Sequence, residues 1–154
     1  MAMKTVTVLL AIALATQKPP ASTPAPALNS AEVREIQRTL LVHLVTTRCQ
    51  KRTCVPTIRE RSIDLKFLSS LSKMGSVTPL RPGDFLVKDG AAGAFRRISA
   101  TILDLGDAHS VGTSTAKIVV HEISTVLSRR NCIYVVRRKS SGWVVDDDEA
   151  ICSS

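Results

Sequence analysis

The second half of the chain contains four segments rich in β-branched residues, each separated from the next by a turn signal. Valine, isoleucine and threonine fit the pleated, half-buried surface of a sheet, while glycine and short polar residues favour turns. Successive segments of this kind favour antiparallel pairing of neighbours, which predicts a meander. The predicted strands are residues 96–105, 115–127, 131–139 and 143–149, and the separators are Gly106-Asp107 through Gly112, Arg129-Arg130 and Ser140-Ser141-Gly142.

A helix is predicted ahead of these strands. Asn29 is a suitable N-cap residue, and Glu32 stands three residues later, at the capping-box position. Apolar side chains then recur at helical spacing and form one stripe, while charged side chains face water. The stripe consists of Val33, Ile36, Gln37, Leu40, Leu41, Leu44 and Val45, and the charged residues are Arg34, Glu35 and Arg38.

The stretch between this helix and the strands is less regular. Thr57 and Glu60 have the spacing of a second capping box, and a short helix is predicted near residues 64–74, ended by Gly75. Residues 75–94 are rich in proline and glycine, which indicates a loop with at most one short strand, near Phe85–Val87.

These elements predict a single α+β domain over residues 29–152. One long N-terminal helix and a short helix would pack on a four-stranded or larger antiparallel meander. Residues 16–28 contain four prolines and are typical of a Pro/Ala-rich disordered tether.

Residues 1–15 have the pattern of a secretory signal peptide. Lys4 supplies the positive n-region, Thr5 to Leu14 the apolar h-region, and Ala13-Leu14-Ala15 the small-residue cleavage site. The apolar run is well short of the roughly 20 residues that span a bilayer, so we expect no transmembrane segment in the mature form. An uncleaved N-terminal anchor is the alternative. We therefore expect an exported protein, either periplasmic or secreted.

Four cysteines in an exported chain favour two disulfides, for which three connectivities exist. Cys49 with Cys54 would close a short loop, and Cys132 with Cys152 would join the last two strands. If the final turn places Arg138 opposite the first residue after Gly142, the second pair is offset by three residues, roughly 10 Å along a strand. The tail would then fold back, the turn would differ, or one of the later cysteines would bond to the Cys49/Cys54 loop. The Cys-x4-Cys spacing is not that of thiol oxidoreductases, and no second pair with zinc-ligand spacing is present.

Charge limits the class of partner. The chain has 21 Lys and Arg against 13 Asp and Glu, a net charge of +8, and removal of Lys4 with the signal peptide leaves 8 − 1 = +7. Such a chain is attracted to anionic surfaces. The chain has one Trp, one Tyr and three Phe, too few to interleave with its basic clusters as base-stacking platforms, so we expect no nucleic-acid partner.

The acidic run Asp146-Asp147-Asp148-Glu149 suggests a cation site, but alternation along a strand would turn neighbouring carboxylates to opposite faces. We therefore expect a solvated strand end that balances Arg137-Arg138-Lys139. No metal site and no cofactor are predicted.

Two residues are weak candidates for chemistry. His121 lies within a predicted strand and could act as a general base or polar anchor, or be a structural histidine. Tyr134 could serve as a polar donor, and strand parity leaves open whether the two share a face. His43 is expected to pack at the helix edge and His109 to lie solvated in a turn. No nucleophile elbow, zinc-protease motif or phosphate-binding glycine loop is present.

Residues 95–150 resemble the cone-shaped nuclear transport factor 2-like superfamily. The resemblance includes the closing hairpin from Cys132 to Asp148, in which Trp143 follows a basic turn and opens a strand that ends in acids. It implies a cone-shaped α+β fold. Enzymes of that superfamily hold an Asp or His in the cone, and no residue here matches such a motif closely enough to take over its role.

The resulting hypothesis is a small, exported, disulfide-stapled, non-enzymatic binding or interaction domain for a small apolar ligand or an envelope protein. One alternative is a cone-type isomerase, dehydratase or hydrolase with His121 as base and Tyr134 as donor. A deep pocket that contained both residues would favour this enzyme. A further alternative is a cell-envelope structural protein retained by charge.

Overall fold

The computed structural model describes residues 24–80, 100–124 and 128–154 of the chain. The predicted signal peptide, most of the tether and the predicted strand near Phe85–Val87 lie outside these residues. The described part contains two helices and one six-stranded sheet, which confirms the α+β class. Within it, neither helix has the length and apolar character needed to cross a membrane.

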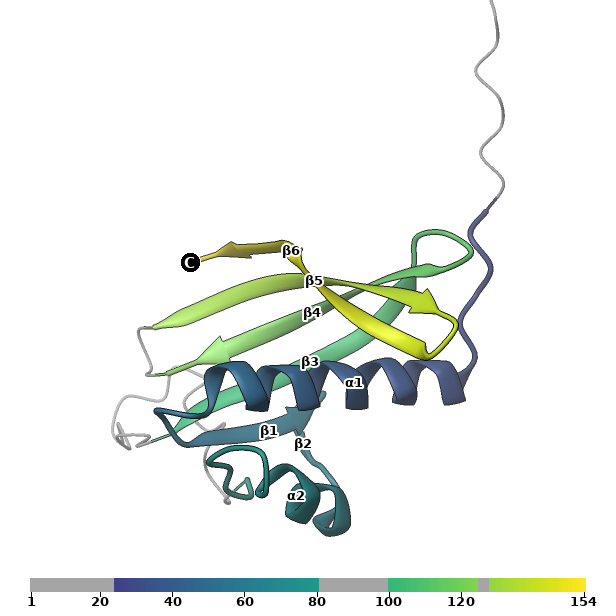
Figure 1. Ribbon diagram of the computed structural model, residues 1–154. Coiled ribbons are helices and arrows are strands. Elements are labelled where there is room, and N and C mark those ends of the chain that lie inside the picture. The colour runs from purple at the N-terminus through teal and green to yellow at the C-terminus, as the bar shows by residue number, and fades with distance from the viewer. Residues whose placement is uncertain (1–23, 81–99, 125–127) are drawn as a thin grey trace, which may run out of the picture.

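The sheet has the strand order β2-β1-β3-β4-β5-β6, and α1 lies along one of its faces (Figure 1). The strands β3 to β6 are successive antiparallel neighbours, as a meander requires. The prediction of a purely antiparallel meander is wrong beyond β3, because β1 pairs with β3 in parallel. The strands are β1 (Cys54–Ile58), β2 (Arg61–Ser62), β3 (Thr101–Ser110), β4 (Thr115–Ile123), β5 (Arg129–Lys139) and β6 (Gly142–Ser153).

β1 escaped detection for a physical reason. Its first four residues are all buried, so both faces of the strand lack the polar alternation that marks a half-exposed strand. Thr57 therefore lies inside a strand, and the second capping box predicted at Thr57 and Glu60 does not form. Asp64 is the N-cap of α2 (Leu65–Leu71) instead, and its side chain accepts from the Phe67 N–H at 2.8 Å.

α1 spans Ser30–Arg48 and begins at the predicted cap. The Asn29 side chain accepts from the Glu32 N–H, and the Glu32 carboxylate accepts from the Asn29 N–H, which completes the capping box. The apolar stripe of α1 packs on one face of the sheet and forms the core, together with Leu103, Leu105, Ile118, Val120, Tyr134 and Val136.

Both disulfides join neighbouring parts of the fold. Cys49–Cys54 closes the turn from α1 into β1, and Cys132–Cys152 joins two residues that are directly opposite each other on β5 and β6. The final turn is the one assumed in the sequence analysis, with Arg138 opposite Trp143, and a register shift between Ile133 and Val135 supplies the three missing residues. The extra residues lie on β6, at Asp147 to Ala150, because Ile133 pairs with Ile151 and Val135 with Asp146.

Gly75 stands where the chain leaves α2, close to the end of α1. A side-chain Cβ at this position would lie 2.7 Å from the carbonyl oxygen of Val45. Gly75 is therefore needed for the close approach of two backbones. α2 itself ends earlier than predicted, at Leu71.

Candidate functional site

The pairing registers place Thr57, Asp104, His121 and Asn131 side by side across β1, β3, β4 and β5. Their strand neighbours, such as Leu103, pack in the core against α1. Because successive side chains of a strand point to opposite faces, the polar row lies on the side turned away from α1. We call this side the far face and the side under α1 the covered face.

A pocket of about 450 Å³ lies on the far face around this row. Its lining comes from the β1–β2 turn and from β3, β4 and β5, so the pocket exists only when the sheet has formed. The lining residues are Arg59, Glu60, Asp104, Gly106, His121, Ile123, Arg129 and Asn131.

The β1–β2 turn is held in an unfavourable backbone conformation beside this pocket. Arg59 has φ 51° and Glu60 has φ 61°, values that glycine and asparagine adopt more easily than longer residues. The nearly buried Asp104 fixes the turn, because its Oδ1 accepts from the Glu60 N–H at 2.7 Å and from the Thr57 hydroxyl at 2.8 Å. Strained backbone that the surroundings hold in place is common at binding and active sites.

His121 and Asn131 both line the pocket and contact each other. Asn131 Oδ1 lies 2.7 Å from His121 Nδ1, and a carbonyl oxygen can only accept, so Nδ1 carries the proton. In this tautomer Nε2 is an acceptor, and the Asn131 amide keeps its NH₂ group as a donor. This pair fixes the side-chain orientation that a recognition site needs.

β3 carries an irregularity next to the pocket. Its register with β4 shifts between Leu105 and Ala108, and this bulge includes Gly106, whose carbonyl accepts from Gln37 of α1 at 3.0 Å. The following residue, Asp107, lies 3.7 Å from Arg59 in an exposed ion pair. α1 and the strained turn therefore both contact residues of this bulge.

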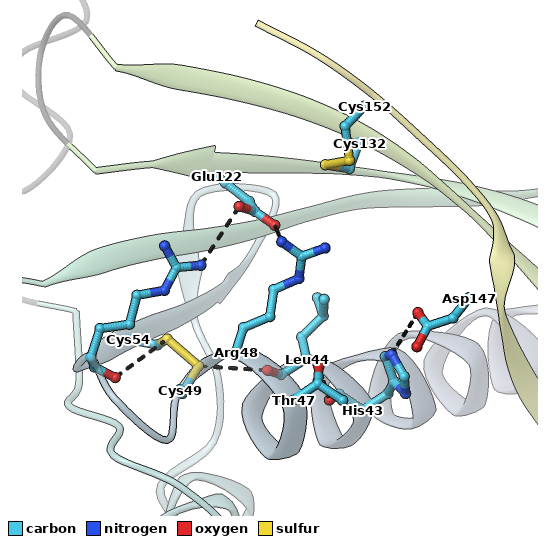
Figure 2. Close-up of polar contacts among 11 residues, drawn as sticks. His43, Leu44, Thr47, Arg48, Cys49, Cys54, Glu122, Cys132, Asp147 and Cys152 are labelled. Atoms are coloured by element: carbon cyan, nitrogen blue, oxygen red, sulfur yellow. Dashed lines mark hydrogen bonds and ion pairs between the residues drawn. A yellow bond between two sulfur atoms is a disulfide. The ribbon is translucent and has the colours of Figure 1, made fainter.

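The covered face contains a second polar cluster, near the C-terminal end of α1 (Figure 2). The Glu122 carboxylate is only 5% exposed and lies 3.2 Å from Arg48 Nη1 and 3.7 Å from Arg52 Nη2. These are ion pairs without hydrogen-bond geometry, since Glu122 Oε1 has no hydrogen-bond partner among the described residues. The cluster ties the end of α1 to β4.

Two further buried polar atoms of the covered face, Tyr134 Oη and Trp143 Nε1, lack a hydrogen-bond partner among the described residues. Burial raises the pKa of the Tyr134 phenol, and the charge of Arg48 opposes that rise. Tyr134 is fully buried, so no reactant reaches its hydroxyl.

The two candidate residues of the sequence analysis are thus on opposite faces. His121 pairs with Asn131 on the far face, and Tyr134 pairs with Ile118 on the covered face. The pocket contains His121 but not Tyr134. Of the other histidines, His43 lies 2.8 Å from Asp147, and His109 is exposed but lies within β3 rather than in the predicted turn.

The acidic run is organised by the β6 irregularity. Arg137 forms ion pairs with Asp146, at 2.8 Å, and with Glu149, and the hydrogen bonds to these carboxylates raise the Arg137 pKa. Alternation was expected to separate these acids, but the extra residues on β6 bring both to one guanidinium. The expectation that the run balances the basic end of the partner strand holds for Arg137. Over the described residues, no group of His, Cys, Asp and Glu is arranged to hold a metal ion.

Sequence reasoning missed most of the pocket. Arg59 and Glu60 come from a turn next to an unrecognised strand, and Asn131 was not paired with His121 because β4 ends at Ile123 rather than near 127.

No protein-family model, curated protein or solved structure matches this chain.

Proposed function

We propose that this protein is an exported, non-enzymatic binding domain and that the far-face pocket is its binding site. The observation that carries the proposal is the hydrogen bond between His121 and Asn131 in the lining of the pocket. It leaves His121 Nε2 as an acceptor and the Asn131 NH₂ group as a donor for a ligand. A small number of fixed polar groups in a concave site is the usual basis of ligand recognition.

The backbone strain of the β1–β2 turn supports the same site. Arg59 and Glu60 hold conformations that cost stability, and both side chains line the pocket. Export is supported by the two disulfides, which are stable in oxidising compartments. The cone-type enzyme is the weaker alternative, because its base and its donor occupy different faces of the sheet.

The test is native mass spectrometry of the full chain, purified without reductant from the export compartment, followed by a fragment screen observed by NMR. The screen contains anionic, cationic and apolar fragments. We expect at least one class to shift the signals of pocket residues. His121→Leu should abolish these shifts, and His109→Leu should leave them unchanged, because His109 is exposed outside the pocket.

Two results would contradict this proposal. One is that no fragment class shifts the pocket signals. The other is turnover of a co-purified molecule that His121→Gln abolishes while the fold is intact, because this would assign the pocket to an enzyme.

A further inference from the structure

The hydrogen-bonding groups of the pocket define a ligand class, on the condition that the pocket is the binding site proposed above. Asn131 uses its carbonyl oxygen on His121, so its NH₂ group is left to donate. His121 uses Nδ1–H on Asn131, so its Nε2 is left to accept. A ligand that satisfies both groups needs an acceptor and a donor close together.

Arg129 adds a cation to these two groups. It lies at the start of β5, two residues before Asn131, and alternation places both side chains on the far face. Among the described residues Arg129 has no ion pair, whereas Arg59 pairs with Asp107. The guanidinium presents several donors in a planar fork, which suits the oxygens of a carboxylate or phosphate.

Two carboxylates in the lining narrow the class of anion that the pocket can bind. Asp104 and Glu60 also line it, and Asp104 lies beside His121 in the register. Like charges at short range repel a fully ionised anion more than one that keeps a proton. A ligand hydroxyl supplies the donor for His121 Nε2, and in hydrogen phosphate that hydroxyl also keeps the charge below that of the fully ionised anion.

We propose that the pocket binds an oxyanion that carries a hydroxyl on or next to its charged group. Its oxygens accept from Arg129 and from the Asn131 NH₂ group, and its hydroxyl donates to His121 Nε2. Hydrogen phosphate and a 2-hydroxycarboxylate share this chemistry.

The experiment is an NMR titration of the full chain at constant ionic strength with four probes: inorganic phosphate, sulfate, glycolate and acetate. Sulfate lacks the proton of hydrogen phosphate, and acetate lacks the hydroxyl of glycolate. We expect phosphate or glycolate to shift the His121 imidazole and Asn131 side-chain amide signals, with an affinity about tenfold or more above that of its unhydroxylated counterpart. Binding of phosphate would identify the ligand's charged group as a phosphate, and binding of glycolate would identify it as a carboxylate.

Arg129→Gln should weaken this binding about tenfold or more, because it removes the cation. Arg130→Gln is the matched control, since it removes the same charge from the neighbouring residue. Arg130 lies opposite Glu122 in the strand register and does not line the pocket. Its effect should be less than about twofold.

Three outcomes would overturn the inference. Sulfate and acetate could bind as tightly as their partners, or Arg130→Gln could weaken binding as much as Arg129→Gln. The third is that only cationic or apolar fragments shift the pocket signals, which leaves the binding function standing and removes the oxyanion. If no fragment of any class acts, the proposed function fails with it.

Discussion

The two faces of the sheet differ in how their polar side chains are hydrogen-bonded. On the far face, Asp104 accepts two hydrogen bonds, and His121 and Asn131 bond to each other within reach of solvent. On the covered face, the Tyr134 hydroxyl and the Trp143 indole N–H are buried without a hydrogen-bond partner among the described residues.

This difference shows which requirement dominates on each face. An unpaired buried polar atom costs about 1–3 kcal/mol, and the covered face tolerates it because those aromatic rings bury much apolar area. The polar groups of the far-face row are hydrogen-bonded instead, beside the buried apolar side chains of Val55 and Ile102 on the same face. The covered face therefore contains the main hydrophobic cluster, and the far face contains the polar row that lines the pocket.

The largest expected effect comes from removing apolar volume from the covered face. Leu40→Ala should lower the free energy of unfolding by about 2–5 kcal/mol, because Leu40 is fully buried in the core. Ile151→Ala on the far face should cost less than about 0.5 kcal/mol, since its side chain is 68% exposed. Denaturant unfolding measures both. Equal losses would mean that the Ile151 side chain is also packed in solution.

The disulfides come next, and all four cysteines pack with the covered-face core. Replacing Cys132 and Cys152 together by alanine should cost about 3 kcal/mol, and the same change at Cys49 and Cys54 about 2 kcal/mol, because the longer loop loses more entropy when closed. The two pairs are 20 and 5 residues apart. Unfolding without reductant, compared between the two double variants, gives the order. The reverse order would show that native-state packing rather than chain entropy decides their contributions.

The sequence was informative where one physical signal acted alone. β-Branched content and turn signals predicted four strands that correspond to β3 to β6, and a capping box located the start of α1. Two of the expected separators were wrong, because residues 106–110 continue β3 and Arg129-Arg130 begin β5. Prediction from the sequence failed where burial removed the alternation, as in β1, and where extra residues changed the register, as in β6. The three-residue offset between Cys132 and Cys152 was visible in the sequence, but the irregularity that absorbs it was not.

The pocket was harder to predict because its residues meet only through pairing registers. His121 was identifiable by residue type, whereas Asn131 matters only because it lies opposite His121 on β5. Arg59 and Glu60 reach the pocket through a turn whose backbone no sequence signal indicated, since neither residue is typical of positive φ.

Tyr134→Phe tests the tolerance of the covered face. Removing the unpaired hydroxyl should leave stability unchanged or raise it by up to about 1 kcal/mol at neutral pH. The Tyr134 pKa is raised in the folded state, so the unfolded chain ionises first and wild-type stability should fall as pH rises above about 10. Tyr134 is the one tyrosine of the chain, so its phenolate absorbance reports this titration directly. A large loss of stability in Tyr134→Phe would contradict this difference between the two faces, because it would show that the hydroxyl has a hydrogen-bond partner.

The smallest effect tests the strain beside the pocket. Arg59→Gly should raise the free energy of unfolding by about 0.5 kcal/mol, because glycine adopts φ 51° without steric cost and this gain exceeds the entropy that glycine adds to the unfolded chain. Arg61→Gly is the matched control two residues along, in β2, where φ is not positive, and it should lower stability by about 0.5–1 kcal/mol. Thermal unfolding of both variants measures the signs. Opposite signs would mean that arginine is kept at position 59 at a cost in stability, as expected for a residue that serves the pocket, whereas a loss in both variants would show that the turn is not strained.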